Sequence, residues 1–181
     1  MKMQAGARLF FALWPDAPTR RALGAWAHDL RAGLGGRRVA DADIHLTLFF
    51  LGQVPDARVP RMQSAPSMDC GPFDLVIDHV GWWRHNQIAW AAPVVTPHAM
   101  NSLVHQLGQW LRAQHVEIDS RPFAPHVTLL RGARSGTVPV FAQPIRWRVD
   151  EFALVRSNLQ SVDSRYAVIG RFPLSLSLIH I

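Results

Sequence analysis

"HLTLFFLG" (residues 45–52) and "HVTLLR" (residues 126–131) share one pattern: a histidine, an apolar residue, a threonine and further apolar residues. The chain has nine histidines among 181 residues. With its few threonines, random placement would give roughly 0.25 His-x-Thr triplets, so a chance match is a small but real risk. Two triplets are present. Their repetition favours a shared structural and chemical role over coincidence.

The physical meaning of the triplet follows from strand geometry. Side chains at positions i and i+2 of a β-strand point to the same face, so His45 and Thr47 share a face. His126 and Thr128 do the same, and in both segments the apolar residues lie on the other face. If a pseudo-two-fold axis relates the two halves, the polar pairs face each other across a cleft. Arg131, five positions after His126, needs a bulge or a strand end to reach that cleft.

Outward from these segments, the hydrophobic pattern predicts alternating strands and helices. We expect a strand at 8–13, a helix at 17–34 and a loop or broken helix at 53–72. A second helix is expected to start at Thr96-Pro97, with Thr96 as its N-cap. Two hairpins are expected, one from 73–83 and 87–93 and one from 146–156 and 166–174.

Each half therefore reads as helix, His-x-Thr strand, connector and hairpin. This predicts an α+β fold with two pseudo-symmetric lobes, each an antiparallel sheet backed by helices, and an active site in the cleft between them.

Composition sets the broad class of the protein. Hydrophobic residues make up 49% and charged residues 18% of the chain, as in ordinary globular domains. The net charge of +6 comes almost entirely from arginine, because Lys2 is the only lysine. Such a surface attracts phosphates, although arginine replacing lysine explains the composition equally well. Cys70 is the only cysteine, and no apolar run approaches the ~18 residues of a membrane span. A cytoplasmic protein without membrane contact is expected.

Two imidazoles and two hydroxyls around one cleft suit phosphodiester cleavage. Attacking water must lose a proton, the leaving oxygen must gain one, and histidine can serve in either role near neutral pH. The hydroxyls of Thr47 and Thr128 could donate to the non-bridging oxygens, and Arg131 could add charge-assisted contacts. No cofactor or metal is expected, since the sequence has no His-x-His or His-Glu-x-x-His spacing. Asp41 and Asp43 are expected to solvate the turn before the strand.

The paired motifs "HLTLFFLG" and "RPFAPHVTLLR" resemble those of the two-histidine (2H) phosphoesterase superfamily. Within it, the chain is similar to the RNA 2',3'-cyclic phosphodiesterases, also called bacterial 2'-5' RNA ligases. The segments "RLFFALWP", "IAWAAP" and "DEFALVRSNL" extend the resemblance over roughly residues 8–174.

The resemblance implies metal-independent hydrolysis of a terminal 2',3'-cyclic phosphate on RNA to a 2'-phosphate. It implies His45 as proton donor, His126 as proton acceptor, and Thr47, Thr128 and Arg131 as the phosphate-binding set. Near-symmetry makes the donor and acceptor hard to tell apart from sequence. Phe50, and Phe10 or Phe11, could stack on a base, with ordinary core packing as the alternative. The expected partner is a single-stranded RNA end or a tRNA fragment, bound by a monomer.

Other activities use the same residues. Reversible 2'-5' RNA end joining or hydrolysis of a small cyclic nucleotide needs the same acid–base pair. A non-catalytic RNA-binding module would need only charge and aromatic rings, and it would not require two intact His-x-Thr triplets. The expected domain is 1–174, and residues 175–181 are expected to be an atypical tail outside it.

Overall fold

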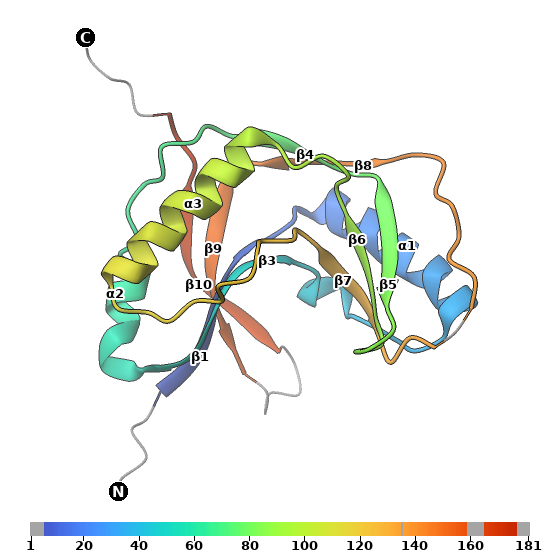
Figure 1. Ribbon diagram of the computed structural model, residues 1–181, viewed down its shortest axis with the longest axis horizontal. Coiled ribbons are helices and arrows are strands. Elements are labelled where there is room, and N and C mark those ends of the chain that lie inside the picture. The colour runs from blue at the N-terminus through green and yellow to red at the C-terminus, as the bar shows by residue number, and fades with distance from the viewer. Residues whose placement is uncertain (1–5, 135, 159–164, 177–181) are drawn as a thin grey trace, which may run out of the picture.

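The computed structural model describes residues 6–134, 136–158 and 165–176 (Figure 1). The strands are β1 (Gly6–Leu13), β2 (Arg37–Arg38), β3 (Leu46–Pro55), β4 (Phe73–Ile77), β5 (His79–Trp83), β6 (Ile88–Ala92), β7 (Val127–Arg131), β8 (Ile145–Val149), β9 (Glu151–Ser157) and β10 (Tyr166–Pro173). The helices are α1 (Ala17–Leu34), α2 (Val59–Gln63) and α3 (His98–Ala113), and short 3-10 turns occupy Asp41–Asp43 and Asp56–Arg58. None of the described helices is long and apolar enough to span a membrane.

Eight of the strands form one antiparallel sheet in the order β10-β9-β1-β3-β7-β6-β5, with β2 beside β7. At its centre, β3 and β7 meet through a single residue pair, Leu46 opposite Val127. The sheet therefore divides into a first lobe of β1, β3, β9 and β10 and a second lobe of β2, β5, β6 and β7. Figure 1 shows the two groups of strands diverging from this junction.

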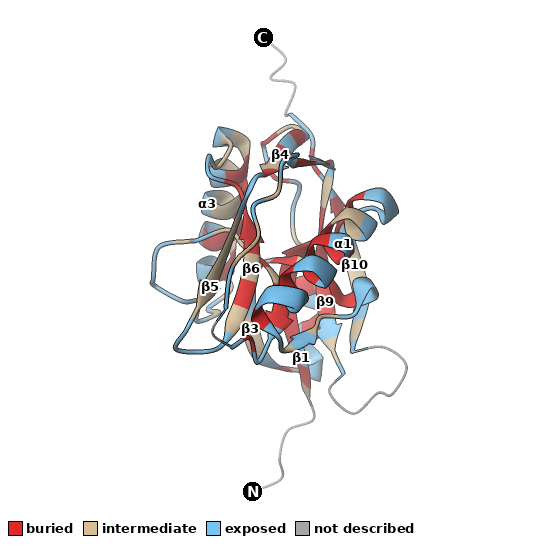
Figure 2. Ribbon diagram, turned by 90° about the vertical axis from the view of Figure 1, so that its right-hand side faces the viewer, coloured by how far each residue is buried: buried red, intermediate tan, exposed pale blue. Residues whose placement is uncertain are grey.

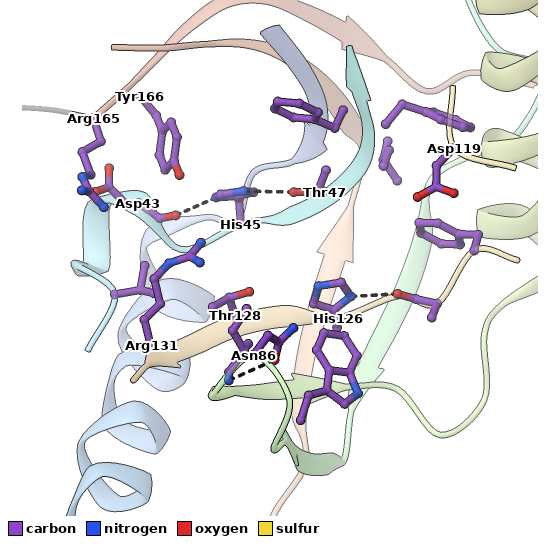
Figure 3. A pocket seen from close by; sticks show the side chains of 18 of the residues that line it. Asp43, His45, Thr47, Asn86, Asp119, His126, Thr128, Arg131, Arg165 and Tyr166 are labelled. Atoms are coloured by element: carbon purple, nitrogen blue, oxygen red, sulfur yellow. Dashed lines mark hydrogen bonds between the residues drawn. The ribbon is translucent and has the colours of Figure 1, made fainter. Parts of the chain in front are cut away.

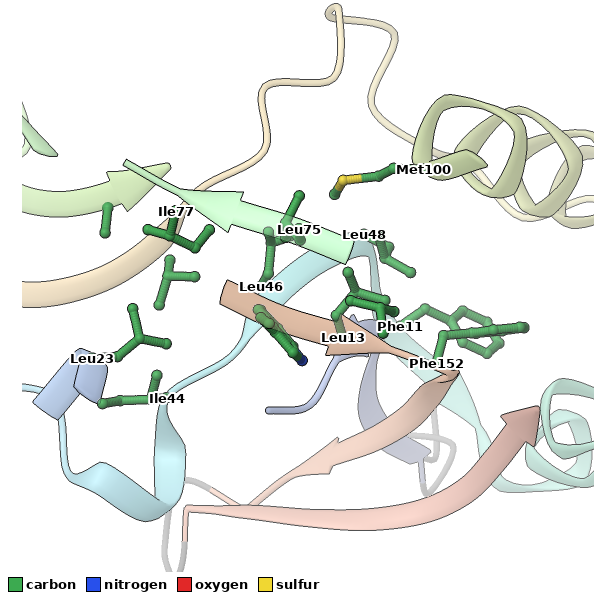
Figure 4. Close-up of a cluster of buried hydrophobic side chains, with 14 of the residues drawn as sticks. Phe11, Leu13, Leu23, Ile44, Leu46, Leu48, Leu75, Ile77, Met100 and Phe152 are labelled. Carbon is green, nitrogen blue, oxygen red and sulfur yellow. The ribbon is translucent and has the colours of Figure 1, made fainter. Parts of the chain in front are cut away.

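A helix covers the apolar face of each lobe. In the first lobe, the ring of Trp110 on α3 lies 6.3 Å from that of Phe11 on β1. In the second lobe, α1 packs against β7. The ends of α1 follow from its sequence: the Asp16 side chain accepts a hydrogen bond from the Thr19 backbone N–H at 2.8 Å, and Gly35 adopts a positive φ of 65° after the last turn. Leu46 and Leu48 lie in the core between the elements (Figure 4).

The expected α+β bilobal architecture is confirmed, but the lobes are not the two halves of the sequence. The β5–β6 hairpin, which follows β3 in the chain, pairs with β7 in the second lobe. The β9–β10 hairpin, which follows β7, pairs with β1 in the first lobe. The hairpin of each half of the sequence thus lies in the lobe that contains the other half's His-x-Thr strand.

Both hairpins are shorter than the sequence pattern predicts. Phe73–Ile77 and Ile145–Val149 do not belong to them, because β4 and β8 pair with each other in a separate two-stranded sheet. The hairpins themselves begin at β5 and β9. The long-range pairing of two short apolar strands is a tertiary effect that no local pattern in either segment indicates.

Three smaller differences concern helix starts and the chain end. Helix α3 begins at His98 with Pro97 as its N-cap, so the expected capping by Thr96 is wrong. The stretch 53–72 is a broken helix in part, with only α2 formed. Ser175 makes a β-bridge with Asp69, so described contacts reach one residue past the expected boundary at 174. Residues 177–181 of the expected tail lie outside the described residues, and the domain boundary stays a prediction.

A register shift in each central strand decides which side chains reach the cleft. On β7, Thr128 lies opposite Trp90 and Leu130 lies opposite Ala89, so Leu129 has no partner on β6. The extra residue reverses the alternation, and it brings Arg131 to the face of Thr128. On β3, Leu48 is skipped in the same way between the partners of Phe11 and Ala12 on β1. The irregularity at Leu129 is the bulge that Arg131 requires to reach the cleft.

Candidate active site

The two histidines and both threonines line one cavity of about 1160 Å³ between the lobes (Figure 3). The β3–β7 junction explains the arrangement, because Leu46 and Val127, which directly follow the histidines, lie opposite each other. Both residues are fully buried, so the neighbouring polar side chains face away from the core. The structure therefore brings together all five residues expected to act on the phosphate, since Arg131 also lines this cavity.

Both imidazoles are held in the same way. His45 Nδ1 lies 2.7 Å from the Asp43 carbonyl oxygen, and His126 Nδ1 lies 2.9 Å from the Ala124 carbonyl oxygen. A carbonyl only accepts hydrogen bonds, so Nδ1 must donate in each ring. In a neutral ring, Nε2 is then the unprotonated nitrogen and can accept a proton. Each histidine thus has a fixed tautomer, and its Nε2 is available for proton transfer.

Around His45, three aromatic rings form an enclosure. Trp14 stacks on the imidazole with ring centroids 5.3 Å apart and planes 6° apart. Phe10 lies 4.9 Å away, and Tyr166 meets the ring edge-on at 5.2 Å. Thr47 Oγ1 is 3.1 Å from His45 Nε2. The edge of the imidazole that carries Nε2 therefore faces the polar Thr47 hydroxyl, whereas the three aromatic rings pack against other parts of the ring.

This environment changes the titration of His45. Its pKa is lowered to about 4, mainly by burial, and the positive charge of Arg131 and the proximity of His126 contribute in the same direction. The hydrogen bond with the Asp43 carbonyl acts in the opposite direction. In this environment, His45 is therefore neutral at pH 7.

His126 has a more open setting. Its ring meets Trp83 of β5 at 4.7 Å with an interplanar angle of 72°. The two histidines thus share backbone anchoring but differ in aromatic enclosure. This difference distinguishes two residues that the repeated motif presents as equivalent.

The two phenylalanines expected to stack on a base have different positions. Phe50 is 49% exposed and lines the cavity, with the Arg8 guanidinium carbon 4.7 Å from its ring centroid. Phe10 is only 2% exposed and packs against the His45 ring, so it has no free face for a base. Phe11 is fully buried in the core. We therefore correct the assignment of Phe10 from base stacking to support of His45.

Several residues at the site have no signal in the His-x-Thr motif. Asp43, expected to be a solvated turn residue, is 8% exposed and lines the cavity. Burial raises the pKa of its carboxyl group, and the positive charge of Arg165 opposes that rise. Trp14 and Tyr166 come from the ends of distant elements. Only Trp14 had a local hint, because it follows directly after an apolar strand.

Within the described part of the chain, no group of three or more His, Cys, Asp and Glu side chains is placed to hold a metal ion. The charged groups on the cavity wall are mostly arginines, which suit an anionic ligand. They are Arg37, Arg38, Arg121, Arg131 and Arg165. Arg38 is paired with Asp41 at 2.8 Å.

The stacking of Trp14 on His45 generates a prediction. Replacing Trp14 by leucine opens one ring face to water, and hydration stabilises the charged imidazolium. The pKa of His45 should therefore rise from about 4 toward the ordinary value of 6.5. An NMR titration of the histidine Hε1 signals measures it. Trp83→Leu, which removes the ring beside His126, is the matched control and should leave the His45 titration unchanged. An unchanged His45 pKa in Trp14→Leu contradicts the enclosure as its cause.

Known proteins resemble this chain in both sequence and structure. The sequence profile of the LigT-like phosphoesterase family matches residues 13–90. The chain is 30% identical over 170 residues to the RNA 2',3'-cyclic phosphodiesterase of Escherichia coli (strain K12), covering 93% of this chain and 97% of the relative. It is 29% identical over 183 residues to the protein of the same name from Thermus thermophilus, covering 92% of this chain and 90% of that relative.

Among solved structures, E. coli LigT complexed with 3'-AMP superposes with a TM-score of 0.82 at 28% identity. The alignment covers 94% of this chain and 99% of that one. The resemblance drawn from the paired motifs is thereby confirmed over nearly the whole chain. The chain belongs to the LigT-like phosphoesterases of the two-histidine (2H) phosphoesterase superfamily.

Proposed function

We propose that this protein hydrolyses the terminal 2',3'-cyclic phosphate of RNA to a 2'-phosphate. The observation that carries the proposal is the pair of imidazoles, each anchored through Nδ1 to a backbone carbonyl, on the wall of one cavity. The names of the E. coli and T. thermophilus relatives support the same activity. Hydrolysis by this pair needs no metal, since the two rings supply both proton transfers.

In the proposed mechanism, His126 Nε2 takes a proton from water as the water oxygen attacks phosphorus. The P–O3' bond breaks, and His45 donates a proton to the departing 3' oxygen, which leaves the phosphate on the 2' oxygen. Thr47 and Thr128 donate hydrogen bonds to the non-bridging oxygens, where negative charge builds up. Arg131, brought to the same face by the bulge at Leu129, adds a charge-assisted contact.

The donor role of His45 requires that the substrate change its protonation. A nearby phosphate anion favours the imidazolium, so the pKa of His45 must rise from about 4 when the ligand binds. The aromatic enclosure destabilises the protonated form of His45. Once the ring is charged, it is therefore a strong proton donor. The surroundings that lower the pKa of His45 thus also favour its proposed donor step.

The substrate end fits the cavity in charge and size. Phe50 exposes about half of its surface at the cavity, and we assign it to stacking on the terminal base. The volume of about 1160 Å³ lies just above the range of about 300–1,000 Å³ that is typical of small-ligand pockets, so the cavity has room for the terminal nucleotide of an RNA. We propose that a cytoplasmic monomer binds a single-stranded end of this kind. End joining uses the same groups in reverse, and water in excess favours hydrolysis.

Removing either imidazole tests the mechanism. His45→Ala and His126→Ala should each lower kcat by about 10²- to 10⁴-fold on 2',3'-cyclic AMP and on a short RNA ending in a cyclic phosphate. The double variant should lose little more, because the two rings act as a unit. Wild-type turnover should be the same with EDTA.

The matched control is His105→Ala, because His105 is an exposed histidine of α3 that does not line the cavity. It should retain wild-type turnover. Full activity in either cavity variant would refute the acid–base pair. Loss of wild-type activity in EDTA would indicate a metal-dependent reaction instead.

The assignment of donor and acceptor has its own test. With adenosine 2'-phosphate bound, an NMR titration of His45 should give a pKa clearly above the value of about 4 in the free protein. If the pKa stays near 4 in the complex, His45 remains neutral beside the phosphate. The donor role would then belong to His126.

A further inference from the structure

The cleft faces of the two lobes are built differently. In the first lobe, Phe10, Ala12, Ala153 and Val155 form a small buried cluster on the cleft side, against which Trp14, Tyr166 and Val168 pack. In the second lobe, the sheet ends at the edge strand β5. Figure 2 shows β5 at this edge, coloured mainly as partly buried.

The open face of the second lobe presents a row of aromatic rings that starts at the active site. The distance between ring centroids is 4.7 Å from Trp83 to His126, 5.3 Å from Trp90 to Trp83 and 5.6 Å from His79 to Trp90. We call Trp83, Trp90 and His79 the hairpin aromatic row.

Strand register shows that the row is on the cleft side. Trp90 of β6 lies directly opposite Thr128 of β7 and opposite Gly81 of β5. Directly opposed residues project from the same face, and residues at i and i+2 share a face. The row therefore lies on the face that carries Thr128, away from α1.

Trp90 lies flat against the neighbouring strand. A Cβ placed on Gly81 would come within 2.2 Å of Trp90 Cζ2, so the indole occupies the space that a side chain would fill. The Trp90 Nε1 atom is buried and has no hydrogen-bond partner among the described residues, which places the nitrogen edge against the protein. Trp83 and Trp90 are both partly exposed, and neither belongs to the two hydrophobic clusters or packs against them.

We propose that the hairpin aromatic row binds the nucleotide that precedes the cyclic end of the RNA, by stacking on its base. This deepens the proposed function and rests on it. A 2',3'-cyclic phosphate marks the 3' end, so the chain continues only through the 5' oxygen of the terminal nucleotide. Because the terminal base is assigned to Phe50, the aromatic surface that continues from the other side of the cavity is left for an upstream nucleotide.

Three features support an RNA strand as the occupant. Trp83 is itself part of the cavity wall, so the row is continuous with the catalytic site. Aromatic platforms beside arginines are the usual means of binding single-stranded nucleic acid without sequence preference. Arg131, at the end of β7, lies opposite Ile88 at the start of the same hairpin strand that carries Trp90.

The experiment compares a substrate that reaches the row with one that does not. Trp90→Leu and His79→Ala would be assayed on 2',3'-cyclic AMP and on a tetranucleotide ending in a cyclic phosphate. We expect KM for the tetranucleotide to rise about tenfold in Trp90→Leu and less in His79→Ala. The kinetic constants for cyclic AMP should stay within about twofold of wild type.

Phe141→Leu is the matched control, since Phe141 stacks on Trp26 of α1 at 4.2 Å and does not line the cavity. Phe141→Leu should leave the kinetic constants for both substrates unchanged. Equal effects on both substrates, or no effect on the tetranucleotide, would overturn the proposal. His79 is exposed, so His79→Ala keeps the test valid if Trp90→Leu fails to fold.

If wild-type protein hydrolyses neither substrate, the proposed function fails, and the row is tested by binding alone. The affinity for the tetranucleotide ending in a 2'-phosphate is then compared between the wild type and Trp90→Leu. About tenfold weaker binding supports the row without reference to turnover. Equal binding rejects it.

Discussion

The single pairing of Leu46 with Val127 is the constraint on which the site depends. Both side chains are fully buried, so the residues on either side of them must face the cleft. Because the pairing is antiparallel and only one residue long, the two His-x-Thr triplets approach each other head to tail, and the strands then separate. A longer ladder would close the space that a phosphate needs. The active site is thus a consequence of how little the two central strands pair.

Pseudo-symmetry provides the acid–base pair, and local packing makes its members unequal. Both rings are anchored by a carbonyl two residues earlier, which is a property of the repeated strand. The exchanged hairpins then place different surroundings on the two sides. The β9–β10 hairpin brings Tyr166 to His45, whereas β5–β6 brings Trp83 to His126. Hydrolysis needs one donor and one acceptor, and we propose that this exchange is the physical origin of the different roles of His45 and His126.

Sequence predicted what is local and periodic. Alternation placed His45, Thr47, His126 and Thr128 on one kind of face, and it showed that Arg131 required an irregularity, which the structure places at Leu129. Sequence did not predict the exchange of hairpins or the pairing of β4 with β8, because strand partners are chosen by tertiary packing.

The misassignment of Phe10 has the same origin. Its strand position allowed a cleft-facing ring, but only the packing of Trp14, Tyr166 and the imidazole shows that the ring is covered. Asp43 was misjudged for a related reason. Turn residues are usually solvated, and the burial of Asp43 depends on tertiary packing that the local sequence does not indicate.

The most direct test of the central claim is the fate of water oxygen during turnover. An RNA ending in a 2',3'-cyclic phosphate would be incubated with the protein and EDTA in ¹⁸O-labelled water, and the product analysed by mass spectrometry and ³¹P NMR. The account predicts a 2'-phosphate carrying one ¹⁸O atom. A 3'-phosphate would place the proton donor on the wrong oxygen, and unlabelled or unreacted RNA would contradict hydrolysis by this histidine pair.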